Sequence, residues 1–260
     1  MKIDSYDKLP IGKYLAILAL DKELPDLEYK TEVVAILNGT TVEAVLDQPL
    51  TVTRDQMQAA DFLLQPMPRH DGKKVASSYK LGGLTLIPCT NVRNWNTAQY
   101  IDYQTYAKNT NPKVIPELLS CVLVPKGYAY NSGYDITAVH QAIRDYLPVA
   151  EAHRISAFFF AEISALHADY PNLFPSGSKE DSEEGEDGKA DGVDSADAAA
   201  GGFSDRWGWI HNVDVVSETT RQPWKEIWEM NIVEFLNILC YRRDKREWEK
   251  AELEKWKRTH

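Results

Sequence analysis

The chain has 260 residues, 43% of them hydrophobic and 10% aromatic, which is enough to bury a core in one or two domains. Its net charge of -10 argues against nonspecific nucleic-acid binding, which depends on Lys and Arg neutralising phosphates. The first apolar run spans about ten residues between acids, whereas a membrane span needs about 20, so we expect neither a signal peptide nor a membrane helix.

The first 65 residues are divided into short amphipathic helices by prolines and caps. Pro10 opens the first helix, and Asp26 is expected to cap a second one that ends at Gly39. A short third helix stops at Pro49, and Thr53 is expected to cap a fourth. Four helices in this stretch predict a helical bundle.

Residues 79–87 contain two short β-prone runs around Gly82 and Gly83, a pair that supplies the positive φ of a tight hairpin turn. This is the one β element that we predict. Further helices are expected after Asn96 or Thr97, over 112–124, after Asp135 and after Pro148. The expected fold is therefore mainly α with a small β hairpin, in the α+β class.

Aromatic residues cluster on two of these helices. Tyr100, Tyr103 and Tyr106 form one stripe, for which packing is favoured over base stacking in so acidic a protein. Residues 158–160 are three consecutive phenylalanines that span about 200° of a helix, so either this helix is central or one ring meets a partner.

Cysteines and histidines indicate no cofactor. Cys89, Cys121 and Cys240 are odd in number and form no CxxC or Cys/His cluster, which predicts neither a disulfide framework nor a zinc site and fits a reducing cytoplasm. His140 lies on an apolar helix face, as a core or boundary residue does. We expect no metal and no other cofactor.

Catalytic patterns are equally weak. Gly12 and Lys13 lack the second glycine and the Ser or Thr of a phosphate-binding loop. Asp102 and Glu117 could serve as an acid and a base, but nothing in the sequence selects this pair over other acids. No strained nucleophile turn or G-x-S-x-G motif accompanies them. An enzyme with a diffuse site stays the third alternative, behind two kinds of non-enzymatic protein.

Residues 175–203 differ from the rest of the chain, with nine acids against two lysines. Such a segment cannot bury enough apolar surface to offset its ordering entropy, so we expect a disordered linker. The expected organisation is a helical domain over 1–172, a linker over 173–204 and a helical C-terminal segment over 205–260.

The C-terminal segment changes character along its length. An apolar face at helical spacing gives way near Arg242 to opposite charges at i, i+3 and i+4, such as Arg243 with Glu247, which support a solvated helix. One interpretation is that this segment folds back and completes the core of the first domain. The other is a tethered recognition element, which is favoured because Trp, Tyr, Met and Arg dominate interface hot spots. The candidate protein-binding residues are Trp224, Trp228, Met230, Ile232, Phe235, Leu236, Leu239, Tyr241 and Trp248.

The stretch "WEMNIVEFLNILCYRRDKREWEKAELEKW" resembles the end of tailed-phage tail assembly chaperones and related small phage assembly proteins. The motifs "LPIGKYLAIL" and "TAQYIDYQTY" and the glycine hairpin are similar in layout to small phage tail and baseplate assembly proteins. The resemblance implies a non-enzymatic chaperone in the cytoplasm of the bacterial host that binds the tape measure and tail tube proteins and is absent from the virion. The alternative is a structural virion protein such as a tail connector or baseplate component.

Overall fold

The computed structural model describes residues 3–68, 73–174 and 203–259, without the side chains of residues 203–206. Their contacts form two compact units: unit 1 is residues 1–90 and 102–162, and unit 2 is residues 91–101 and 163–260. This division differs from the expected one, because residues 91–101 and 163–172 group with the C-terminal helices. The expected linker over 173–204 lies, apart from its ends, outside the described residues.

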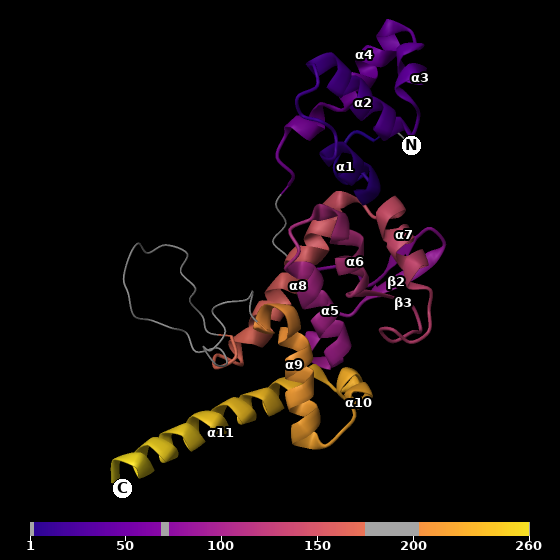
Figure 1. Cartoon of the computed structure of the whole chain (residues 1–260). Coiled ribbons are helices and arrows are strands. Elements are labelled where there is room, and N and C mark those ends of the chain that lie inside the picture. Colours follow the sequence, from indigo (N-terminus) through magenta and orange to yellow (C-terminus); the bar gives the residue numbers. More distant parts are fainter. Residues whose placement is uncertain (1–2, 69–72, 175–202, 260) are drawn as a thin grey trace. The chain divides into compact units, whose positions relative to one another are not determined.

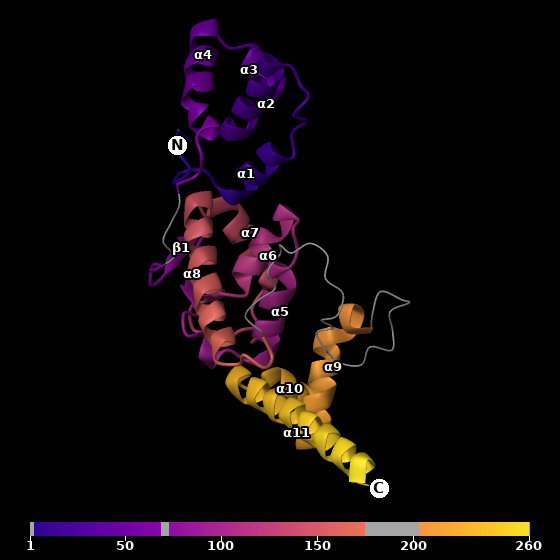
Figure 2. The same cartoon turned by 90° about the vertical axis from the view of Figure 1, so that its left-hand side faces the viewer.

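Unit 1 begins with α1 (Ile11–Leu18), α2 (Asp26–Asn38), α3 (Val42–Leu46), α4 (Leu50–Ala59) and the 3-10 turn η1 (Asp61–Leu64), whose four α-helices are labelled in Figures 1 and 2. Gly39, with φ 68°, ends α2 in the left-handed conformation, as expected.

Two expected caps of this region are wrong. Asp26 is the first residue of α2, after the extended Pro25, and α4 begins at Leu50, so that Thr53 lies inside it. Prolines fix φ of the residue before each of these helices, and the hydroxyl of Thr53 reaches back to Val45 O (3.4 Å) instead of capping.

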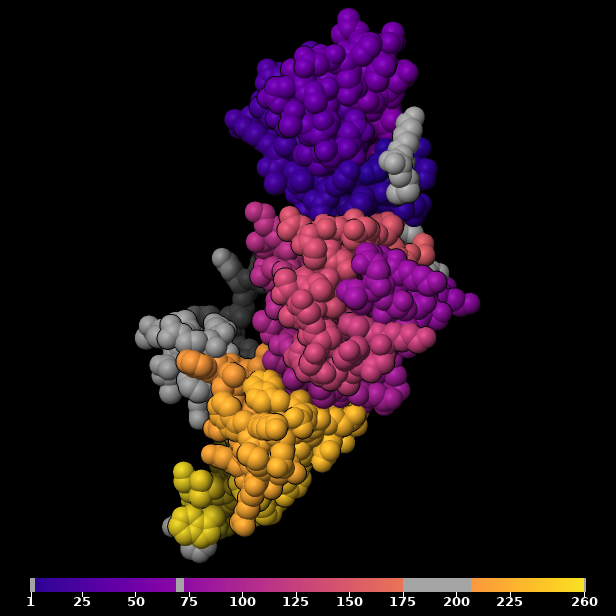
Figure 3. All heavy atoms as spheres, turned by 90° about the vertical axis from the view of Figure 1, so that its right-hand side faces the viewer, coloured from indigo at the N-terminus to yellow at the C-terminus, as the bar shows by residue number. Residues whose placement is uncertain are grey.

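The predicted hairpin is present as β1 (Tyr79–Leu81) and β2 (Leu84–Pro88), with Leu81 opposite Leu84. Gly82 and Gly83 have φ of 53° and 87°, as a two-residue hairpin turn requires. A side chain at Gly82 would collide with the ring of Tyr146 on α7 (Ile136–Tyr146), and Figure 3 shows the hairpin against the residues of α7.

A third strand, β3 (Leu123–Pro125), pairs antiparallel with β2 to give the sheet order β1-β2-β3. The helix expected over 112–124 is therefore wrong in its last part. The chain forms the 3-10 turn η3 (Pro112–Val114) and α6 (Ile115–Ser120) before it enters the strand. The periodicity of a short apolar run such as residues 121–124 does not distinguish a helix from a strand. In the structure the end of this run pairs with the edge of β2 and is therefore a strand.

The core of unit 1 joins its first helices to the start of α8 (Val149–Ala168). Ile11 N donates to Leu147 O (3.0 Å) and Val149 N donates to Leu9 O (2.8 Å), which forms a short backbone bridge. The buried apolar cluster around this bridge is Leu9, Ile17, Val33, Leu37 and Val149.

Helix caps of α5 (Thr97–Ala107) and α7 match the expectations: Asn96 Oδ1 accepts from Gln99 N at 2.8 Å, and Asp135 Oδ1 accepts from Thr137 N at 2.9 Å. Tyr100 and Tyr103 are buried, so their expected packing role is confirmed.

The three consecutive phenylalanines of α8 differ in burial, because they span about 200° of the helix. Phe159 is fully buried, Phe158 is half-buried and Phe160 is 72% exposed.

Unit 2 consists of the 3-10 turn η2 (Val92–Asn94), the start of α5, the end of α8, and the helices α9 (Phe203–Thr220), α10 (Trp224–Glu229) and α11 (Ile232–Thr259). The C-terminal segment expected over 205–260 is helical, as predicted. The expected mainly helical fold with a small β element is confirmed.

Candidate protein-binding surface

The break between α10 and α11 is fixed by a short backbone pairing with the start of α5. Met230 is extended, and its carbonyl accepts hydrogen bonds from Thr97 N (2.8 Å) and Thr97 Oγ1 (3.0 Å). Ile232 N then donates to Trp95 O (2.9 Å). Because Thr97 is fully buried, these bonds are shielded from water, and they set the point from which α11 leaves.

Asn231 caps α11 and ties it to η2 at the same time. Its Oδ1 accepts from Val233 N (2.9 Å), which satisfies one open N–H of the first turn, and its Nδ2 donates to Arg93 O (2.8 Å). The side chain of Arg93 in turn pairs with Asp169 at 2.5 Å.

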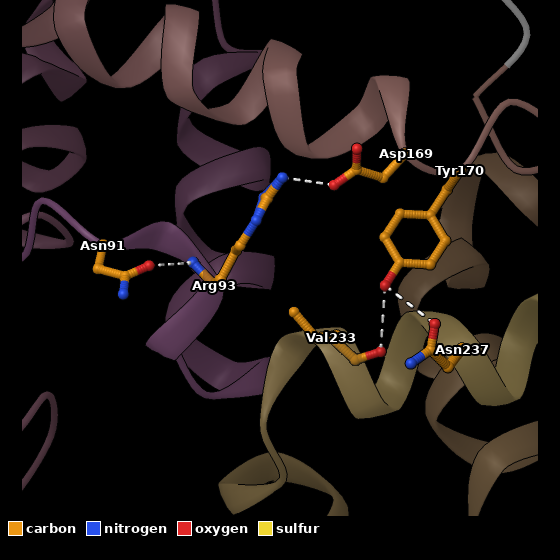
Figure 4. A network of polar contacts seen from close by, with 6 residues as sticks. All are labelled: Asn91, Arg93, Asp169, Tyr170, Val233 and Asn237. Atoms are coloured by element: carbon orange, nitrogen blue, oxygen red, sulfur yellow. Dashed lines mark hydrogen bonds and ion pairs between the residues drawn. The ribbon is translucent and has the colours of Figure 1, made fainter.

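Polar contacts from the residues after α8 continue along α11 (Figure 4). Tyr170 Oη lies within hydrogen-bonding distance of Asn237 Oδ1 (3.0 Å) and Val233 O (3.3 Å). Burial raises the pKa of Tyr170, so the phenol remains a donor at neutral pH. Further along, Asn172 Nδ2 donates to Asp244 Oδ1 (3.1 Å). The first half of α11 is therefore held over about three turns.

Five of the nine candidate residues serve this packing instead of forming an exposed surface. The expectation for them is corrected, because α11 packs against α9 and η2 and removes their side chains from water. Each such burial contributes about 1.5–3 kcal/mol. Of the two interpretations of the C-terminal segment, folding back describes the first half of α11. This half packs within unit 2. The five buried residues are Met230, Ile232, Phe235, Leu236 and Leu239.

The remaining four candidates are partly or largely accessible. Trp228 is half-buried, and Trp224 is 42% exposed with its Nε1 donating to Asp214 Oδ1 at 3.2 Å. Tyr241 and Trp248 are 58% and 63% exposed. These residues are accessible to a partner.

Beyond them, α11 continues as a single rod past α9 and α10, as Figures 1 and 2 show. All residues from 246 to 259 are exposed. They include Leu253 and Trp256, which are 53% and 59% exposed and were not among the candidates. Their i, i+3 spacing inside the charged stretch was the signal that could have found them.

A groove of about 490 Å³ lies between the end of α9 and the first turns of α11. Its lining is mainly apolar and includes Thr219, Val233, Glu234, Ile238 and Tyr241. A second pocket, of about 200 Å³, adjoins it through the shared Glu234. This pocket is acidic, with the carboxylates of Glu226, Glu229 and Glu234 around it.

In unit 1, Asp102 and the backbone carbonyl of Glu117 contact the two members of one pair of side chains, Tyr130 and Cys121. Tyr130 Oη donates to Asp102 Oδ2 (2.7 Å) and lies 3.9 Å from Cys121 Sγ, which contacts Glu117 O at 3.4 Å. Burial raises the pKa of Cys121 to about 12 and also raises that of Asp102. A thiol that stays protonated is a poor nucleophile, so this cluster is better suited to packing than to catalysis.

Ser120 Oγ and His140 Nε2 are 2.9 Å apart, but the direction of their hydrogen bond is opposite to that of a nucleophile and its general base. Ser120 Oγ donates its one proton to Glu117 O (2.7 Å), so His140 Nε2 must donate to Ser120. Burial lowers the pKa of His140, which is half-buried as a boundary residue. Lys13, from the weak phosphate-loop match, donates to Leu37 O (2.5 Å).

Across residues 3–68, 73–174 and 203–259, no three His, Cys, Asp or Glu side chains gather as metal ligands would. Within the same ranges, no helix has the length and apolar character of a membrane span. No family model, curated protein or solved structure matches the chain.

Proposed function

We propose that this protein is a non-enzymatic assembly chaperone that binds other proteins through the outer part of α11. The observation that carries the proposal is the exposure of residues 246–259, which include the large side chains of Trp248, Leu253 and Trp256. Large aromatic side chains dominate binding hot spots, and a helix that presents its apolar residues outward suits docking into a groove.

The resemblance of the C-terminal sequence to tailed-phage tail assembly chaperones supports specific partners, the tape measure and tail tube proteins, in the cytoplasm of the bacterial host. Under this proposal α11 binds one tail component and unit 1 binds the other. Two binding sites on one chain raise the effective concentration of one partner near the other, to the millimolar range for short connections, without any chemical step.

Co-purification of the full chain with the tape measure and tail tube proteins of the same phage tests the proposal. The variant Trp248→Ala/Trp256→Ala is expected to weaken binding of one of them at least tenfold, or about 1.4 kcal/mol. The matched control, Leu50→Ala/Leu64→Ala, removes side chains that are 88% and 77% exposed on unit 1 and should leave that interaction unchanged. Equal binding by all three proteins would contradict the proposed role of α11.

A structural virion component such as a tail connector or baseplate protein is the alternative. Mass spectrometry of purified particles separates the two, because a chaperone is missing from finished virions and a structural component is present in them.

A further inference from the structure

The acidic pocket beside the groove presents three carboxylates without a cation of their own. Glu226, Glu229 and Glu234 are exposed, and none of the ion pairs among the described residues involves them. The groove that shares Glu234 has an apolar wall formed by Val233 and Ile238. Together they fit a ligand segment that carries a large apolar side chain next to positive charge.

The far end of α11 has this composition. Leu253, Trp256 and Lys257 are spaced i, i+3, i+4 and so lie on one face of the helix. Lys257 and Arg258 take part in none of the described ion pairs, whereas Lys255 pairs with Glu252 at 2.6 Å. Residues 253–258 therefore combine exposed apolar side chains with two cations that have no acidic partner on their own helix.

This end cannot reach the groove of its own chain. α11 is continuous from Ile232 to Thr259, and Trp256 follows Ile238 by 18 residues, which is about 27 Å along a helix axis. Folding back over that distance would require breaking the helix. Residues 253–258 could therefore fill such a groove only on another molecule.

We propose that the occupant is a second copy of this chain, whose residues 253–258 dock into the groove and the acidic pocket. Leu253 and Trp256 of one copy would cover the apolar wall, and Lys257 and Arg258 would face the pocket carboxylates of the other. The contact joins two different surfaces, so a pair of copies keeps one free groove and one free helix end. Such head-to-tail contacts close into rings or grow into open chains.

Basic residues in the last turn also stabilise a helix through its macrodipole. Docking differs from that role because it predicts that reversing the charges of Lys257 and Arg258 weakens association of the chain. The inference shares Trp256 with the proposed function but needs no tail protein. Self-association is measured with the purified chain alone, so one proposal can fail while the other stands.

Sedimentation velocity of the full chain, up to about 100 μM and at about 0.05 and 0.5 M salt, tests the proposal. The wild type should form dimers and larger species that dissociate at high salt. The pocket variant Glu226→Lys/Glu229→Lys and the tail variant Lys257→Glu/Arg258→Glu should each weaken association at least tenfold. Far-UV circular dichroism checks that each variant keeps its helices.

Mixing the two variants is the decisive step. The intact tail of the pocket variant can fill the intact pocket of the tail variant, and the reversed charges of the remaining pocket and tail also attract each other, so the mixture should regain the dimers and larger species of the wild type. A second tail variant, Leu253→Ala/Trp256→Ala, keeps the terminal charges and should weaken association as the first does. Its mixture with the pocket variant should stop at one-to-one dimers, because its positive tail is repelled by the Lys residues of the altered pocket. The control Glu23→Lys/Asp47→Lys makes the same charge change as the pocket variant at exposed acids of unit 1 and should associate like the wild type.

Three results would overturn the inference. They are a wild-type chain that stays monomeric at all concentrations, a control variant that loses association as fully as the pocket variant, and a mixture of well-folded variants that remains monomeric. The last result would indicate a symmetric contact or none.

Discussion

Phe235 offers the sharpest test of the packing of α11, because its side chain is fully buried in unit 2. Replacing a buried Phe with Ala removes its burial and leaves a cavity, which costs about 3–5 kcal/mol of unfolding free energy. A domain is typically stable by about 5–15 kcal/mol, so Phe235→Ala should remove a large part of the stability of unit 2. With a urea m value of about 2 kcal/mol/M, the midpoint should fall by about 1.5–2.5 M.

Tryptophan fluorescence measures this transition selectively, because all seven tryptophans of the chain lie in residues 91–101 and 163–260. The matched control is Leu253→Ala on the same helix, where a side chain 53% exposed should change the free energy by less than about 0.5 kcal/mol. If the two variants differ by less than about 1 kcal/mol, the first half of α11 does not form the core described here.

Four further predictions follow from single contacts. Asn231→Ala should lower the free energy of unfolding of unit 2 by about 1–2 kcal/mol, because a cap and a bond to η2 are lost; an unchanged fluorescence midpoint would contradict this. Gly82→Ala should destabilise unit 1 by about 1–3 kcal/mol in urea titrations followed by circular dichroism, because a side chain at positive φ would also meet a ring of α7 at 2.6 Å. Burial raises the pKa of the Cys121 thiol from 9.0 to about 12, so the thiol should resist alkylation at about pH 8 until the chain unfolds. The free energy of unfolding should decline between about pH 9 and 12, because only the unfolded thiol ionises in that range. Rapid labelling of the native chain, measured by mass spectrometry, would refute this. Burial also raises the pKa of Asp102, which penalises its charge above the folded pKa, so Asp102→Asn should be at least as stable as the wild type at pH 7 and lose any advantage in acid; a lower urea midpoint at pH 7 would count against this explanation.

Local signals predicted most helices, because the groups that start and stop a helix are close in sequence. Asp135, Asn96 and Gly39 act at the ends of helices as their residue types indicate. The Gly82 and Gly83 turn likewise requires a conformation that glycine adopts without strain. Where two signals competed, as at Pro49 and Thr53, the covalent constraint of the proline set the start of the helix.

Strand β3 could not be predicted in this way. Residues 123–125 are too few for a periodicity to show, and their partner β2 lies more than 30 residues earlier in the chain. Pairing across such a separation depends on how the intervening helices fold.

The candidate surface shows the same limit. The sequence marked α11 as the informative helix and placed the change from apolar to charged residues near Arg242. It did not separate Phe235, which is buried, from Trp248, which is exposed, because both are large aromatic residues on one helix.

By itself, therefore, the sequence determined the helical character of the chain, its hairpin and the amphipathic start of α11, all of which depend on neighbours within a few turns. Only the tertiary structure decided which of the apolar residues are covered. That outcome depends on Thr97 meeting Met230 across 133 residues, a contact that no local pattern encodes. The far end of α11 is left exposed, and both proposals are tested by substitutions in this part of the helix.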